Sequence, residues 1–219
     1  MTQQTMQNVD WLIDRPQAVR AWYLFAHGAG APMDSTFMGE IASLLCARGI
    51  GVARFEFPYM AQRRHGGKKR PPEKVDKLVL QYGAALQAFL DGPEFAGEPV
   101  FIGGKSMGGR IAAMLAGSAL PEPVRGVCCL GYPFHPQGKP DTLRLEPLNA
   151  CRLPVLVVQG TRDRLGNREE VDQYPLSDRM RCHWLADGDH DLKPRRQSGY
   201  SHAQHLAETA DAIVNFTQG

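Results

Sequence analysis

The sequence contains no long apolar run and carries little net charge. No stretch of its 219 residues approaches the roughly 18 apolar residues that a membrane-spanning helix needs. The N-terminal residues are polar and lack the apolar core of a secretory signal. The formal net charge of +2 is too small to indicate nucleic-acid binding by itself. We therefore expect a cytoplasmic protein with no membrane partner, and we do not expect nucleic acid as its ligand.

Cysteine is sparse, and its positions form no recognisable framework. The five cysteines are odd in number and show no C-x-x-C spacing, which argues against a disulfide scaffold and against a zinc site. Cys128 and Cys129 are adjacent in an apolar run, and neighbouring residues of a strand point to opposite faces. We interpret them as small core residues. No metal and no cofactor are expected.

The sequence does contain apolar, β-rich runs that alternate with segments of helical periodicity. Such an alternation is typical of a mostly parallel sheet that helices cover on both faces. No internal repeat or flexible linker interrupts the pattern, so we predict one domain over residues 1–219. The predicted strands are 22–26, 51–57, 100–103, 124–130, 154–159 and 182–186, and the main predicted helices are 35–48, 75–89 and 201–214.

The stretch VFIGGKSMGGR, residues 100–110, matches two known motifs at once. Its GKS is the end of a phosphate-binding P-loop, whereas its GKSMG matches the nucleophile motif G-x-S-x-G. The P-loop spacing requires a glycine five residues before Gly104, but Pro99 occupies that position. The residues after Pro99 also resemble a buried strand rather than a loop. The motif therefore favours a nucleophile at Ser106.

The surroundings of Ser106 fit a sharp turn between a strand and a helix. A buried strand precedes the serine, and apolar residues at helical spacing follow it. Such a turn holds its nucleophile in strained backbone geometry, where a neighbouring Cβ would crowd it. Gly104 and Gly108 meet this requirement. On its own, the motif is equally compatible with a glycine-rich turn that ends in a helix-capping serine.

An acid and a histidine follow two later strands in the chain order serine, acid, histidine. Asp163 comes just after strand 154–159, and His190 comes just after strand 182–186. The carboxyl ends of parallel strands lie at one edge of a sheet, so we expect both residues near Ser106. His190 would take the Ser106 proton, and Asp163 would orient His190 and stabilise its cation.

Both assignments have alternatives. Asp163 could instead bond its own backbone as a turn residue, which is a common use of aspartate after a strand. Asp187, Asp189 and Asp191 also lie close to His190, but residues of the same loop cannot easily reach the far side of its ring. Among the seven histidines, His190 has the position that the chain order requires.

An oxyanion hole needs two N–H donors near the nucleophile. Met107 follows Ser106 at a helix N-terminus, where the helix dipole also favours negative charge. The second donor is expected in the loop after the first long strand, where the sequence reads HGAG. We place it at Ala29, with Gly30 as the alternative.

The segments AHGAGAPMDS, GGKSMGGR, GYPFHPQGKP, VQGTRD and DGDHDLKPRRQSG together resemble the small serine α/β-hydrolases of the bacterial dienelactone-hydrolase-like group. Eukaryotic relatives of that group are labelled testis-expressed and NSL-complex hydrolase-like proteins. The resemblance, over roughly residues 20–217, implies the α/β-hydrolase fold and a triad of Ser106, Asp163 and His190. It implies no substrate. True dienelactone hydrolases use cysteine as the nucleophile, so the serine here argues against that activity.

The sequence leaves little room for a lid over the predicted site. About twenty residues, rich in proline, separate Leu130 from Leu153. We therefore expect an open, shallow site that suits short-chain or surface-presented esters better than long lipids. The predicted function is a serine hydrolase that cleaves a carboxylic ester, thioester or lactone in a small-molecule substrate. The alternative is a non-catalytic binding or scaffold protein, because a fold does not fix a function.

One loop is strongly basic despite the small net charge. Residues 63–70 hold five Lys and Arg side chains, and they follow a strand that should end at the edge of the site. Lys139 and residues 193–196 add positive charge at the same edge. Clustered charge at a cleft concentrates anions, so we predict a preference for substrates that carry a carboxylate or phosphate. No aromatic residues interrupt the loop to stack bases, which argues against nucleic acid.

Overall fold

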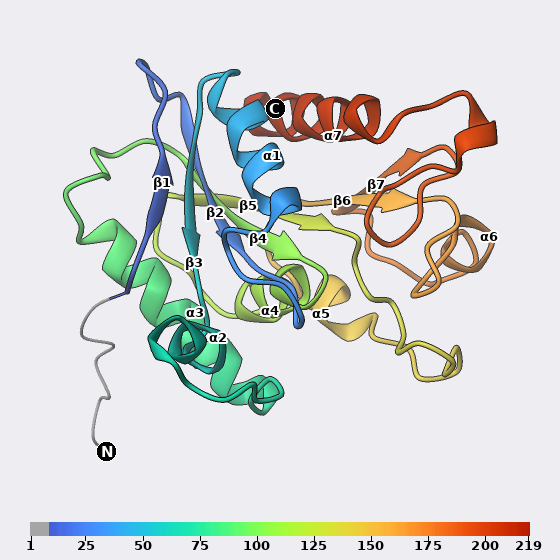
Figure 1. Ribbon diagram of the computed structural model, residues 1–219, viewed down its shortest axis with the longest axis horizontal. Coiled ribbons are helices and arrows are strands. Elements are labelled where there is room, and N and C mark those ends of the chain that lie inside the picture. The colour runs from blue at the N-terminus through green and yellow to red at the C-terminus, as the bar shows by residue number, and fades with distance from the viewer. Residues whose placement is uncertain (1–8) are drawn as a thin grey trace.

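The computed structural model describes residues 9–219, which are built around one seven-stranded sheet (Figure 1). The strands are β1 (Leu12–Asp14), β2 (Ala21–Ala26), β3 (Ile50–Phe55), β4 (Val100–Lys105), β5 (Val124–Leu130), β6 (Val155–Gly160) and β7 (Met180–Leu185). Their order is β1-β3-β2-β4-β5-β6-β7. β1 is antiparallel to β3, and the other neighbouring pairs are parallel. Residues 1–8, which we predicted to be part of the same domain, lie outside the described residues.

Helices cover both faces of the sheet. The α-helices are α1 (Thr36–Cys46), α2 (Pro58–Ala61), α3 (Val75–Leu90), α4 (Met107–Leu115), α5 (Glu146–Asn149), α6 (Arg168–Val171) and α7 (His202–Gln218). Two short 3-10 helices are η1 (Gln62–His65) and η2 (Arg196–Ser198). In Figure 1, α1 and α7 lie on one side of the sheet, and α3, α4 and α5 lie on the other. The predicted architecture, a mostly parallel sheet with helices on both faces, is confirmed.

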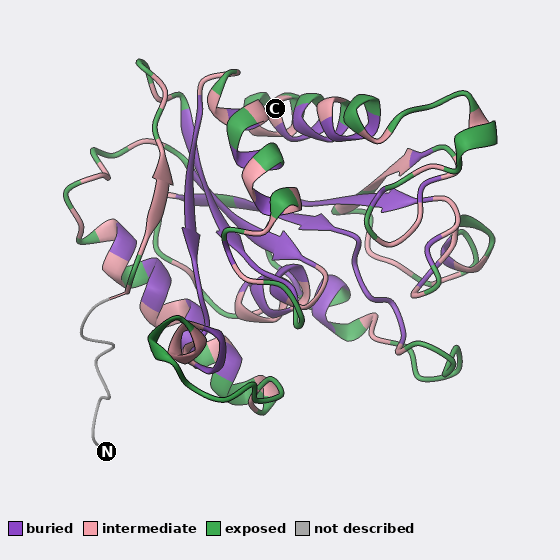
Figure 2. Ribbon diagram, in the orientation of Figure 1, coloured by how far each residue is buried: buried purple, intermediate pink, exposed green. Residues whose placement is uncertain are grey.

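The apolar core has two parts, one on each face of the sheet. β2, β3, β4 and β6 are buried along their whole length, as the purple strands in Figure 2 show. This explains why these strands read as continuous apolar runs. Cys128 packs in the part under α1 and α7, whereas Cys129 packs in the part under α3 and α4. The two adjacent cysteines therefore point to opposite faces, as the sequence predicted.

The predicted strands are all present, with small errors at their ends. β3 ends at Phe55, two residues earlier than expected, because Pro58 starts α2 and the residue before a proline stays extended outside the helix. β4 continues to Lys105, so the strand reaches the residue directly before Ser106. The sequence analysis missed β1, whose three residues are too few to show a period.

Two helices begin with a capping box. Ser201 accepts a hydrogen bond from the backbone N–H of Gln204, and the Gln204 side chain accepts one from the backbone N–H of Ser201, at the start of α7. Asn167 and Glu170 form the same reciprocal pair at the start of α6. Each pair satisfies backbone donors that the first turn of a helix leaves free.

The connection between β5 and β6 contains no lid domain. Residues 131–154 form a loop whose only helix is the four-residue α5. The carboxyl ends of β4, β6 and β7 are therefore left uncovered by an inserted domain. Among the described residues, none of the helices is both long enough and apolar enough to cross a membrane.

Candidate active site

Ser106 lies in the sharp turn between β4 and α4. Its backbone has φ 50° and ψ −111°, a left-handed conformation that a serine adopts only when its surroundings enforce it. Gly104 and Gly108 both pack against the end of β2, where an added Cβ on either would lie 2.5 Å from the Ala26 carbonyl oxygen. The two glycines thus permit the close approach that the sequence predicted.

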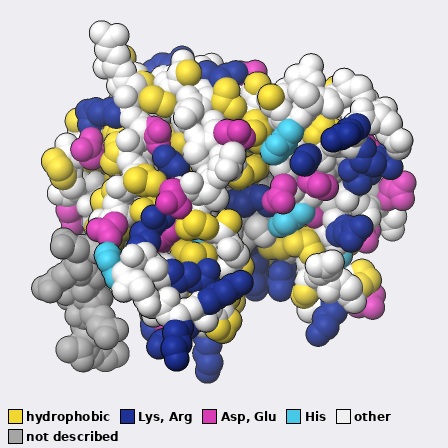
Figure 3. Space-filling model, in the orientation of Figure 1, with side chains coloured by type: hydrophobic (Ala, Val, Ile, Leu, Met, Phe, Trp, Pro, Cys, Tyr) yellow, Lys and Arg dark blue, Asp and Glu magenta, His cyan; other side chains and the backbone are white. Residues whose placement is uncertain are grey.

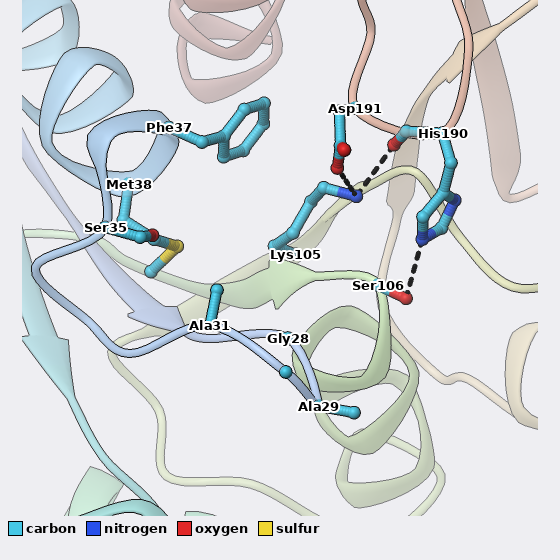
Figure 4. A pocket seen from close by; sticks show the side chains of 11 residues that line it. Gly28, Ala29, Ala31, Ser35, Phe37, Met38, Lys105, Ser106, His190 and Asp191 are labelled. Carbon is cyan, nitrogen blue, oxygen red and sulfur yellow. Dashed lines mark hydrogen bonds and ion pairs between the residues drawn. The ribbon is translucent and has the colours of Figure 1, made fainter.

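The structure brings Ser106, His190 and Asp163 together from three strand ends. His190 Nε2 lies 2.9 Å from Ser106 Oγ, and His190 Nδ1 lies 2.8 Å from Asp163 Oδ2. Figure 4 shows the contact between the histidine ring and the serine hydroxyl. Asp163 is fully buried. This chain of hydrogen bonds allows proton transfer from a serine hydroxyl to an imidazole that a carboxylate orients.

Asp163 uses its two oxygens for different partners. Oδ1 accepts a hydrogen bond of 2.8 Å from the backbone N–H of Leu165, which is the turn role that we considered as an alternative. Oδ2 lies against His190 and also accepts a bond of 2.9 Å from Gln159 Nε2. The same aspartate therefore holds its own turn and the histidine ring.

Gln159 is a buried residue of the site that the sequence analysis missed. Its Oε1 accepts from the backbone N–H of Tyr132, and its Nε2 lies within 3.1 Å of the carbonyl oxygens of Tyr132 and Gly166. It thus ties the loops after β5 and β6 to Asp163. The available signal was an amide at the end of the otherwise apolar run PVLVVQG.

Lys105, directly before Ser106, is a second residue that the sequence analysis did not assign. Its Nζ donates a hydrogen bond of 2.7 Å to the backbone carbonyl of His190 and lies 3.1 Å from Asp191 Oδ1 (Figure 4). Burial lowers the pKa of the Lys105 ammonium group, and the charge of Asp191 opposes that effect. The lysine therefore connects the strand before the nucleophile to the loop that carries His190.

The other acids near His190 have partners of their own. Asp187 forms ion pairs with Arg162 and Arg195, and the hydrogen bonds from Arg195 lower the pKa of Asp187 to about 2. Asp189 accepts bonds from backbone N–H groups of its own turn, and Asp191 pairs with Lys105. This leaves Asp163 as the carboxylate that contacts the His190 ring.

The loop after β2 presents Ala29 beside the nucleophile. Phe57 N–H donates to Nε2 of the buried His27 over 3.1 Å, so the proton of His27 is on Nδ1, which donates to the Gly28 carbonyl over 2.6 Å. In a trans peptide the carbonyl and the next N–H point in opposite directions, so the Ala29 N–H points away from His27. The Ala29 N–H is therefore free of the His27 contact, and its role as the oxyanion donor stays a prediction.

Two cavities meet at Ser106. The first, of about 300 Å³, lies between the loop after β2, the start of α1 and the His190 loop. The second, of about 350 Å³, extends over α4 toward the connection between β5 and β6. Ala29 and Ser106 line both cavities, Met107 lines the second, and His190 lines the first. A bound ester therefore has room on both sides of the serine.

The basic loop does not contribute to either cavity, so this part of the sequence analysis is not supported. Arg64 pairs with Glu56 and Asp34, each at 2.8 Å, and Arg63 donates to the backbone carbonyl of Arg70. Residues 63–70 are absent from the described lining of both cavities. Acidic side chains lie among the basic ones over much of the face in Figure 3.

Within residues 9–219, no group of three potential metal ligands is present.

The fold and the sequence resemble those of known hydrolases. A dienelactone hydrolase from Anabaena variabilis has a TM-score of 0.72 at 18% identity, over 96% of this chain and 94% of that one. A serine hydrolase homologue from Coxiella burnetii gives 0.68 at 18% identity, over 95% and 91%. A serine hydrolase without a lid from Xanthomonas campestris gives 0.68 at 15% identity, over 95% and 89%. A family model described as an alpha/beta hydrolase domain matches residues 19–218, and the chain belongs to this family.

Proposed function

We propose that this protein is a serine hydrolase that cleaves a carboxylic ester, thioester or lactone. The observation that carries the proposal is the continuous chain of hydrogen bonds from Ser106 through His190 to the buried Asp163, at 2.9 and 2.8 Å. A serine in an ordinary helix-capping turn has no reason to contact an imidazole that a buried carboxylate orients. The hydrolases among the similar structures support the same class of reaction.

The proposed reaction has two halves. His190 Nε2 takes the proton of Ser106 as Oγ attacks the carbonyl carbon, and Asp163 stabilises the imidazolium that forms. The N–H groups of Ala29 and Met107 stabilise the negative oxygen of the tetrahedral intermediate. His190 then gives its proton to the leaving group, and an acyl-enzyme remains on Ser106. Water, activated by His190, releases the acid and restores the serine.

The open surroundings of Ser106 favour small substrates. Both cavities are near the lower end of the usual size of small-molecule sites, and no lid domain lies between β5 and β6. Short acyl groups and small leaving groups fit such a site better than long lipid chains.

The relation to the testis-expressed and NSL-complex hydrolase-like proteins is part of this proposal and rests on the motifs alone.

A fluorophosphonate probe tests the proposal directly. The wild-type protein should be labelled on Ser106, and Ser106→Ala should abolish both labelling and hydrolysis of short-chain 4-nitrophenyl esters. His190→Gln should reduce hydrolysis by about 10⁴-fold or more, since the serine loses its base. A wild-type protein that is folded, takes up no probe and hydrolyses no ester would instead support a non-catalytic binding protein.

A further inference from the structure

The second cavity contains two arginine side chains that the proposed reaction does not use. Arg110 lies on α4, one helical turn after Ser106. Arg144 lies in the connection between β5 and β6. Both line the cavity together with Ser106 and Met107. Two cations are therefore placed within reach of any group bound to the nucleophile on this side.

Arg110 lies close to the nucleophile and lacks a partner. Its backbone N–H donates to the Ser106 carbonyl over 3.1 Å, and a long helical side chain leans back over the preceding turn. Arg110 and Ser106 both line the second cavity, so the arginine and the nucleophile border the same space. Its Nε is buried and has no hydrogen-bond acceptor. Within residues 9–219, no carboxylate lies within ion-pair distance of the Arg110 side chain. A carboxylate bound in this cavity would therefore meet a guanidinium whose charge no acid of the described residues offsets.

Arg144 is held in place by its backbone rather than by its charge. Its N–H donates to the Phe134 carbonyl over 2.7 Å, and its own carbonyl accepts from the Tyr132 hydroxyl over 2.9 Å. Burial and the neighbouring charge of Arg110 lower the pKa of Arg144. In the part of the chain that the structure describes, no carboxylate forms an ion pair with it. The protein therefore holds two like charges near each other without neutralising either one.

The one carboxylate in the lining of this cavity is already engaged. Both oxygens of Glu73 have partners, because Oε1 contacts Lys77 Nζ and Oε2 accepts from Gln81 Nε2. In the first cavity the positive charge is offset, because Lys105 forms an ion pair with Asp191. Of the two cavities that Ser106 lines, the second is thus the one whose positive charge no ion pair offsets.

The position of His190 indicates which part of an ester occupies each cavity. The leaving group must take its proton from His190, so it lies on the side of the imidazole. His190 lines the first cavity and a third one of about 280 Å³ between the loop after β6 and its own loop, and it is absent from the lining of the second. The second cavity, which contains Arg110 and Arg144, is left for the acyl group.

We propose that Arg110 and Arg144 bind a carboxylate at the far end of the acyl group, so that the preferred substrates are half-esters or half-thioesters of short dicarboxylic acids. A guanidinium donates two parallel N–H bonds to a carboxylate, and exclusion of water strengthens these bonds. The proposal rests on the proposed hydrolase function. It assigns the anion preference to two residues of the cavity and not to the basic loop.

The test compares acyl groups of equal length with and without the charge. The substrates are the half-esters of glutaric and adipic acid with 4-nitrophenol, against 4-nitrophenyl pentanoate and hexanoate, with the uncatalysed rate subtracted. The wild-type kcat/KM should favour the charged acyl group by about tenfold or more, as expected for charge-assisted hydrogen bonds. Arg110→Met and Arg144→Met should each lower this ratio, and the double variant should bring it to about one.

The matched control is Arg152→Met, which removes an equal charge from an exposed position outside both cavities. It should keep the wild-type ratio. Arg110→Lys, which retains the charge without the planar fork, should give an intermediate ratio. A wild-type ratio of about one would overturn the proposal, as would a high ratio that survives in the double variant.

Binding separates this proposal from the proposed function. Calorimetric titration of the Ser106→Ala variant with adipate needs no catalysis, and it should show binding that Arg110→Met weakens by about tenfold. If no ester is hydrolysed but adipate binds through the two arginines, the hydrolase function fails and the anion site stands. If neutral esters are hydrolysed and adipate does not bind, the anion site fails and the hydrolase function stands.

Discussion

Lys105 illustrates how a residue beside the nucleophile can act on the base. Its Nζ is bonded to the backbone carbonyl of His190 and to Asp191, so it holds the His190 loop against the end of β4. The contact fixes the distance between the serine and the imidazole, which come from chain segments 84 residues apart. We therefore regard Lys105 as a positioning residue.

Substitution of Lys105 tests this role. Lys105→Met keeps the length of the side chain but removes the bonds to His190 and Asp191. Loss of a charge-assisted hydrogen bond of about 1.5–3 kcal/mol should lower kcat by roughly ten- to a hundredfold, because 1.36 kcal/mol corresponds to a factor of ten. KM for a short neutral ester should change much less.

Two controls keep the interpretation specific. Lys105→Arg can still donate to the carbonyl, so it should recover part of kcat and of the rate of fluorophosphonate labelling. Circular dichroism should show a folded protein in both variants. A Lys105→Met protein with the kcat of the wild type would show that the contact does not position the base.

Single residues also mark the limit of the sequence analysis. Ser106, Asp163 and His190 could be found because chain order and strand ends place them without knowledge of packing. Arg110 and Arg144 could not, because an arginine on a helix or in a loop is ordinarily a solvated charge. Only the tertiary structure shows that both arginines line one cavity and that no carboxylate of the described residues forms an ion pair with either.

At the level of elements, the junction of β4 and α4 depends on a close approach of two strands and a helix. An added Cβ on Gly103 would lie 1.8 Å from the Cys128 carbonyl oxygen in β5. Tyr82 on α3 also bonds here, because its hydroxyl accepts from the Gly103 N–H over 2.8 Å. The glycine thus lets β4, β5 and α3 pack together directly below the nucleophile.

Gly103→Ala should therefore destabilise the whole domain. The new methyl group must separate β4 from β5 and would also lie 2.9 Å from the Tyr23 hydroxyl, and overpacking of this kind typically costs about 1–3 kcal/mol or more. Gly39→Ala in α1 is the matched control, since the nearest atom to its added Cβ is a side-chain nitrogen at 3.8 Å. Alanine is also the better helix former by about 1 kcal/mol. Urea unfolding should show opposite signs, and equal midpoints for both variants would contradict the argument.

Elements were easier to predict from the sequence than their ends. Strands buried on both faces are recognisable because they are continuous apolar runs, and their alternation with helices predicts a parallel sheet. β1 was missed because it is short and pairs at the edge of the sheet. The oxyanion donor in the loop after β2 stays a prediction from its position after a strand, whereas the His27 contacts of that loop arise only when the strands are assembled.

For the whole molecule, the ion pairs between individual residues are more informative than the net charge. The net charge is +2, but Arg64, Arg162 and Arg195 are each held by carboxylates in the structure. The Asp187 pairs connect the loop after β6 to the loop that carries His190. The cytoplasmic location remains a prediction from the sequence.

Asp187 should make the stability of this protein depend on pH in the acid range. Its folded pKa of about 2 lies below the usual value of about 3.9, so the ionised carboxylate stabilises the fold above that value. This contribution is lost as the pH falls toward 2. Asp187→Asn keeps a residue type that tolerates the local φ of 58°. Its melting temperature should be lower than that of the wild type at pH 6, and the difference should shrink steadily between pH 4 and pH 2. A difference that is constant over that range would show that Asp187 contributes through its shape and not through its charge.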